Sequence, residues 1–346
     1  MFFKRYLVSS ACVLALTSGA VAAHGQDSVE QFYAGKTIDM IIGYAPGGGY
    51  DQYARLVARF LPEFIPGNPE IIARNMPGGG TRTAASYIYN VAPQDGTILG
   101  TFDQGLPLEQ VLGITPIDGV DTAGFGYVGS PVTSNNVTVT WHESGIESIE
   151  QATAGPMTMG STGSGGAQLY PMVMNARLNT QFEIIAGYPG GNDINLAMEN
   201  GEVDGRGSNA WASYKAATPH FVNNDLINVL VQIGLEAEPD LPEVPLLIDL
   251  ATNPSDEALF RLLSGPVALG RPIMTTPNVP EERLAALRAA FDAMVQDPKF
   301  LAAAAAENLD IINPKSGEQL QQIVQEIVSA EPATVQALFE IATAAQ

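Results

Sequence analysis

Four glycine-rich loops, each after a short apolar run typical of a β-strand, constrain this chain more than any other feature. They span residues 46–51, 77–82, 160–166 and 188–193. Glycine at the end of a strand lets the backbone approach a bound molecule, and the first N–H groups of a following helix are unpaired. Such helix N-termini attract anions. The loops therefore predict a protein that binds a small anionic ligand, mostly through backbone and hydroxyl groups.

The segments between the first loops alternate in type. Residues 38–43 and 70–73 have the composition of strands, residues 83–89 are typical of a helix, and residues 97–102 form the next expected strand. Alternation of strands and helices favours a parallel, helix-covered α/β sheet. Ligands of such sheets lie beyond the carboxyl ends of the strands, where the loops are found.

A second unit of the same kind begins near Tyr127. Its expected strands and helices, followed by a C-terminal helix, are residues 137–141, 149–154, 157–159, 167–176, 182–186, 193–200, 227–233 and 280–295. Residues 316–319 resemble a capping box. No low-complexity linker separates the two units, so we expect a second lobe inserted into the first.

The first 22 residues have the pattern of a secretory signal peptide. Lys4 and Arg5 precede an apolar stretch over residues 6–16, and the small residues 20–22 follow it. We expect cleavage after Ala22 and a soluble, exported, monomeric protein. The single cysteine, Cys12, lies inside this signal, so the mature chain would contain no disulfide.

The charge balance is strongly acidic. The chain has 16 Lys and Arg against 37 Asp and Glu, a formal net charge of −21. Such a surface disfavours nucleic acids and anionic membranes as partners. Because salt screens surface charges over about 8 Å, a local binding site can still be positive.

Six motifs follow one another between about residues 36 and 300, at residues 46–51, 75–80, 92–99, 160–165, 187–191 and 200–204. In this order they resemble the extracytoplasmic solute receptors of the tripartite tricarboxylate transporter family, often called Bug proteins. The resemblance implies an α/β, type 2 periplasmic binding-protein-like fold with a ligand cleft between two lobes. Lobe 1 would comprise residues 27–128 and 236–346, and the inserted lobe 2 residues 129–235. Arg82 and the sequence Gly270-Arg271-Pro272 depart from the family pattern.

The resemblance also implies a function. A receptor of this family captures a small organic carboxylate in the periplasm and delivers it to the membrane permease subunits of a tripartite transporter. We expect a di- or tricarboxylate, or a small carboxylate with one ring. A sensor subunit that presents its ligand to a signalling receptor is the alternative, and a secreted hydrolase is a weaker one.

The candidate ligand contacts lie in or beside the loops. They are Gly47, Gly48, Gly49, Tyr50, Asp51, Gly78, Gly79, Gly80, Thr81, Arg82, Phe102, Ser161, Thr162, Gly163, Ser164, Gly165, Tyr188 and Asp204. We expect Arg82 to clamp a ligand carboxylate, with a solvent-facing arginine as the other interpretation. Asp51 fits ligand contact and helix capping equally well. Arg206 fits a surface charge as well as a site residue.

Enzymatic function is not expected. The sequence contains no Gly-x-Gly-x-x-Gly after the first strand, no phosphate-loop Gly-Lys-Ser/Thr and no Gly-x-Ser-x-Gly. The three histidines, His24, His142 and His220, are far apart, which disfavours a metal site, and we expect no cofactor. With no histidine in the loops, ligand binding should change little between pH 6 and 8.

Overall fold

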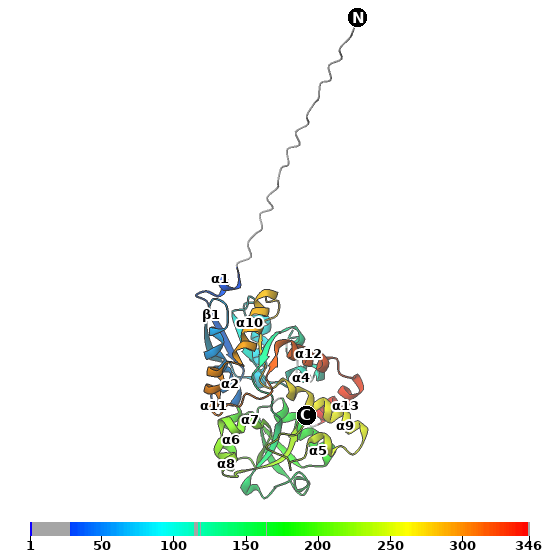
Figure 1. Ribbon diagram of the computed structural model, residues 1–346. Helices are drawn as coiled ribbons and strands as arrows, with labels where there is room; N and C mark the ends of the chain where they lie inside the picture. Colours follow the sequence, from blue (N-terminus) through cyan, green and yellow to red (C-terminus); the bar gives the residue numbers. More distant parts are fainter. Residues whose placement is uncertain (2–27, 114–116, 118, 164, 345–346) are drawn as a thin grey trace.

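The computed structural model describes residues 1, 28–113, 117, 119–163 and 165–344 (Figure 1). The predicted signal segment beyond Met1, with Cys12, and the candidate residue Ser164 lie outside the described residues. No helix in the described part of the chain is long and apolar enough to span a membrane.

Two β-sheets organise the described part of the chain. The six-stranded sheet has the order β11-β4-β10-β3-β1-β2, and the five-stranded sheet has the order β7-β6-β8-β5-β9. The strands are β1 Thr37–Ile42, β2 Glu70–Asn75, β3 Ile98–Thr101, β4 Gly126–Ser130, β5 Asn136–Trp141, β6 Met157–Ser161, β7 Phe182–Ala186, β8 Gly205–Ala210, β9 Ile227–Ile233, β10 Ile273–Thr275 and β11 Lys315–Ser316.

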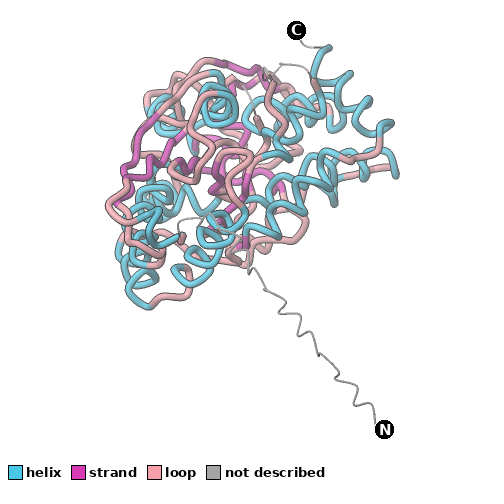
Figure 2. The backbone as a smooth tube through the Cα atoms, turned by 90° about the horizontal axis from the view of Figure 1, so that it is seen from above, coloured by secondary structure: helices cyan, strands magenta, loops and turns pink. Residues whose placement is uncertain are grey.

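Helices lie around the strands, and some strands reach the edge of the molecule (Figure 2). The helices are α1 Val29–Tyr33, α2 Gly49–Phe60, α3 Arg82–Asn90, α4 Leu106–Leu112, α5 Gly166–Leu178, α6 Gly191–Glu199, α7 Trp211–Ala217, α8 Pro219–Asn223, α9 Pro254–Ser264, α10 Glu281–Met294, α11 Pro298–Ala306, α12 Gly317–Val328 and α13 Pro332–Ala344. The Ser316–Gln319 capping box is present at the start of α12.

The parallel sheet predicted from the sequence is only part of the arrangement. β1 pairs in parallel with β2 and β3, and β6 pairs in parallel with β7 and β8. β10, β11, β5 and β9 add antiparallel pairings. The helix expected over residues 149–154 is wrong, because only the 3₁₀ turn Gln151–Thr153 forms there.

The chain passes between the sheets twice, and the two passages are hydrogen-bonded to each other. Asn135 donates from Nδ2 to the carbonyl of Glu236 at 2.6 Å and to Oε1 of Gln232 at 3.1 Å. Ser134 donates to the carboxylate of Glu238 at 2.8 Å. The lobe boundaries at residues 128/129 and 235/236 stay a prediction.

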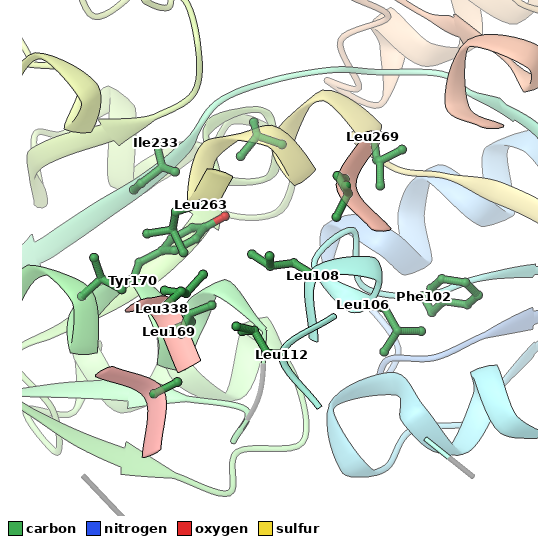
Figure 3. Packing of buried hydrophobic residues seen from close by; sticks show 14 of the residues in the cluster. Phe102, Leu106, Leu108, Leu112, Leu169, Tyr170, Ile233, Leu263, Leu269 and Leu338 are labelled. Carbon is green, nitrogen blue, oxygen red and sulfur yellow. The ribbon is translucent and has the colours of Figure 1, made fainter. Parts of the chain in front are cut away.

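One apolar cluster contains residues from elements of both sheets. Phe102 and Leu106 follow β3, Leu169 and Tyr170 lie on α5, and Leu338 lies on α13; all five belong to the same buried cluster (Figure 3). The C-terminal helix α13 therefore joins the elements of the two sheets on one side of the molecule.

Gly129 tests the packing of α10 on the six-stranded sheet. A Cβ atom there would lie 2.2 Å from ring atoms of the fully buried Phe291. We expect Gly129→Ala to lower the free energy of unfolding by about 1–3 kcal/mol, because the ring must move in a close-packed core. Denaturant unfolding measures this. Gly155→Ala is the matched control, since nothing lies within 4 Å of its Cβ position; equal losses in both variants would contradict the packing argument.

Candidate functional site

A cavity with about 70 Å³ of free space lies between the two sheets. A single water needs roughly 10–15 Å³ on this scale, so there is room for about five waters or a small organic molecule. Residues of both sheets and their connections line it: Tyr44, Ala45, Pro46, Gly48, Gly49, Tyr50, Asp103, Gln104, Gly105, Asn136, Thr162, Gly166, Ala167, Tyr170, Gly190, Gly191, Asn192, Asp193, Arg206, Ser208, Asn209, Ala210, Ser213 and Arg271.

Three helices begin in this lining without a side-chain cap. The N-cap residues are Gly48 for α2, Gly165 for α5 and Gly190 for α6, and none provides a side-chain hydrogen bond to the helix. The Gly165 N–H donates to Glu109, whereas the N–H groups of the first turns receive no hydrogen bond from an N-cap side chain, and the helix dipoles favour negative charge at these ends. These helices follow the first, third and fourth glycine loops. The site therefore has the helix-end geometry expected of a backbone-based anion site.

Two arginines also line the cavity, and both are buried. Arg206 on β8 is 7% exposed, and Arg271, just before β10, is 5% exposed. Arg206 donates from Nη1 to the carbonyl of Gly191 and to Oδ1 of Asn195, both at 3.2 Å. Arg271 donates to the hydroxyl of Ser213, and its guanidinium lies 4.1 Å from the centre of the Tyr50 ring. All of these partners are neutral.

The tyrosines of the site keep their protons. Burial, with the negative charge of Asp103 as the next cause, raises the pKa of Tyr44 and of Tyr50 well above the ordinary value. Tyr44 donates to Oδ2 of Asp103 at 2.6 Å, and the backbone N–H of Gly105 donates to Oδ1 at 2.7 Å. Both carboxylate oxygens of Asp103 therefore have hydrogen-bond donors close to it in the sequence or in the loop after β1.

Asp51 holds the first loop in place and lies outside the lining. This 3%-exposed carboxylate accepts hydrogen bonds from Gly47 N at 2.9 Å, Arg55 Nε at 2.9 Å and Asn75 Nδ2 at 2.7 Å. Burial acts to raise its pKa, but these three donors together hold the pKa below the ordinary value. Of the two interpretations of Asp51, this geometry fits the structural one.

The second loop lines a neighbouring hollow, and Arg82 lines neither this hollow nor the cavity. Arg82 pairs with Glu109 at 3.2 Å and donates to the carbonyl of Gly79 at 2.8 Å. Glu109 also accepts a hydrogen bond from Gly165 N. The candidates Gly78, Gly79, Gly80, Thr81, Thr162 and Tyr188 line this second hollow.

Some of the remaining candidates from the sequence line the cavity and others do not. Gly48, Gly49, Tyr50 and Thr162 line the cavity. The others lie outside its lining: Phe102 is 1% exposed and packs on Phe125, Ser161 accepts from Gly163 N at 3.0 Å, and Asp204 accepts from Thr158 N at 2.7 Å. Gly47 and Gly165 border the lining and contribute their N–H groups to Asp51 and Glu109.

Sequence reasoning left Arg206 open between a site residue and a surface charge, and it did not name other polar side chains of the lining: Tyr44, Asp103, Gln104, Asn136, Tyr170, Ser208, Ser213 and Arg271. A signal existed for the two arginines. Arg206 stands between glycines in a run of small residues, and Arg271 stands between a glycine and a proline. Within the described residues, no group of three or more His, Cys, Asp or Glu side chains is arranged to hold a metal ion.

Comparisons with known proteins identify the fold. No protein-family model matches the sequence, and no curated protein is significantly similar to it. Among solved structures, MatC from Rhodopseudomonas palustris with bound malate aligns with a TM-score of 0.67 and 17% identity over 87% of this chain and 99% of that one. R. palustris Rpa4515 with adipate aligns at 0.68 and 17% over 89% and 97%. The periplasmic binding protein BugD aligns at 0.67 and 15% over 89% and 98%.

The chain has the two-lobed α/β fold of these periplasmic binding proteins. In that frame the cavity occupies the space between the two lobes, with one sheet on each side.

Glu109 should make stability depend on pH. Burial raises its pKa from 4.5 to about 7; Asp103 adds to this, while Arg82 and the Gly165 N–H oppose it. Because the folded state holds this proton more tightly than the unfolded state, stability should fall as pH rises from about 4.5 to about 7, by at most about 3 kcal/mol. Denaturant unfolding across this range, for the unchanged protein and for Glu109→Gln, measures the difference in slope. Glu257→Gln, at an exposed ion pair, should keep the original slope, and parallel curves for Glu109→Gln would contradict the assignment.

Proposed function

We propose that this protein is an extracytoplasmic solute receptor that captures a small organic carboxylate and delivers it to the permease of a tripartite tricarboxylate-type transporter. The observation that carries the proposal is the cavity between the lobes, with three uncapped helix N-termini at its wall. Solved proteins of the same fold hold malate and adipate. The motif order in the sequence supports the same family.

The chemistry of the lining favours a carboxylate. Backbone N–H groups at helix ends, protonated tyrosine hydroxyls and guanidinium groups are all donors to a carboxylate oxygen. The lining combines donors from both lobes, so a ligand that contacts both stabilises the closed arrangement over an open one. A receptor needs this coupling between ligand and lobe closure.

Transport is the proposed purpose of capture. The signal segment over residues 1–22 would export the chain to the periplasm, where the loaded receptor would meet the permease subunits as a monomer. The hydroxyl of Ser161 is fully buried and bonded to Gly163, which supports binding without a chemical step.

A thermal-shift screen tests the ligand class. Organic acids should raise the melting temperature, whereas neutral sugars and polyamines should not. At about 100 times the dissociation constant, linkage gives roughly 2.7 kcal/mol of stabilisation, which corresponds to a rise of several degrees.

Mass spectrometry after long incubation completes this test, because the ligand should be recovered unchanged. A stabilising sugar or polyamine, with no organic acid that stabilises, would overturn the carboxylate assignment. Recovery of a converted product would instead favour an enzyme.

A further inference from the structure

The two cavity arginines lack a carboxylate partner among the described residues. Their side-chain partners are neutral: the carbonyl of Gly191, the amide of Asn195 and the hydroxyl of Tyr214 for Arg206, and the hydroxyl of Ser213 and the side chain of Tyr50 for Arg271. Arginine is otherwise almost never fully buried unless it is paired. A buried cation that has only neutral partners carries a large desolvation penalty, which an anionic ligand would relieve.

Each guanidinium also retains donors. A guanidinium has five N–H donors, and the protein hydrogen bonds above use only some of them. Nε of Arg206 and Nε of Arg271 are buried and have no hydrogen-bond partner in the protein. Both side chains line the same cavity. Unsatisfied donors on buried cations are rare in native structures, and here they occur twice at one site.

The two arginines come from opposite lobes. Arg206 belongs to β8 in the centre of the five-stranded sheet, and Arg271 immediately precedes β10 in the six-stranded sheet. They also affect each other: burial is the main cause that lowers the pKa of Arg206, and the charge of Arg271 contributes to it. Approach of the lobes therefore brings two like charges together. An anion bound between them would offset the repulsion.

Among the described residues, the acidic side chains of the lining form no ion pair with Arg206 or Arg271. Asp103 has one oxygen bonded to Tyr44 and the other to the Gly105 N–H. Asp193 is exposed in the first turn of α6, where the helix dipole favours a carboxylate. The unpartnered Nε–H donors of the two buried arginines are therefore left for a ligand carboxylate.

We propose that Arg206 and Arg271 form a two-point anchor for a small dicarboxylate dianion, with each guanidinium binding one carboxylate. The proposal rests on the proposed receptor function and names the side chains that set its specificity. The second carboxylate of the ligand then determines specificity, because a ligand with one carboxylate leaves one buried guanidinium without an anion. A planar guanidinium also offers two parallel donors to each carboxylate.

Calorimetry with matched ligands tests the anchor. The probes are succinate, glutarate and adipate, each beside its half-amide, which keeps the shape and removes one charge. At least one dianion should bind on the order of 30-fold or more tightly than its half-amide, because a buried charge is then left unpaired. In Arg206→Met and in Arg271→Met, this preference should fall to near one.

Arg283→Met is the matched control. Arg283 also has an unpartnered Nε and neutral contacts, with the Asp95 carbonyl at 3.0 Å and the Phe32 ring at 3.5 Å, but it lies outside the cavity. It should keep both the affinity and the preference. In ligand-free protein, the two cavity variants should melt no lower than the unchanged protein, which verifies that they fold.

Four results would overturn the anchor. They are equal binding of each dianion and its half-amide, a preference that survives in either cavity variant, tighter binding of inorganic phosphate than of all three dicarboxylates, and binding of none of the three. Equal binding would leave the proposed receptor function intact. A receptor that binds no organic acid but is stabilised by a sugar would fail at the level of function.

Discussion

Two guanidinium groups buried between the lobes without a carboxylate partner are the constraint to which the rest of the site is adapted. Isolated charges are costly to remove from water, and a folded domain has only about 5–15 kcal/mol of net stability. The protein offsets the cost with neutral acceptors on Asn195, Gly191 and Ser213, and with the face of Tyr50. These contacts fix the directions of the arginines while leaving charge uncompensated. The cavity is therefore selective because its cations are incompletely satisfied.

The glycine loops make that arrangement possible by letting the lobes come close. A Cβ on Gly49 would lie 2.1 Å from the Ser213 hydroxyl, and a Cβ on Gly47 would lie 2.9 Å from the Asn192 amide. Gly47 also has φ +91°, which other residues rarely adopt. Ser213 is the acceptor for Arg271, so the approach of α2 to α7 and the position of the arginine depend on the same small residue. Larger side chains at these positions would hold the walls apart.

Much of the fold follows from local patterns in the sequence, but the site follows from them only in part. The alternation of apolar strands, glycine loops and amphipathic helices indicates the α/β fold and three of the helix ends that meet at the cavity. β8 escapes prediction because Gly205–Ala210 has no apolar residue except its final alanine, although both faces are buried. Arg206 lies on this strand, so its burial could not be read from hydrophobic periodicity. Arg82, although it follows a glycine loop, has a carboxylate partner in Glu109, which only the tertiary structure brings near it.

Glu109, the partner of Arg82, also affects how the protein should depend on pH. The absence of histidine from the loops predicts binding that is insensitive to pH between 6 and 8, but the prediction considers only groups that titrate there in water. Glu109 titrates at about 7 because burial removes it from water. Its contact with Gly165 N joins α4 of one lobe to the third loop of the other. The Gly165 N–H itself lowers the pKa of Glu109, so burial of the carboxyl group, and not this contact, holds the proton near neutral pH. Burial between the lobes can thus create a neutral-pH titration in a site whose loops contain no histidine.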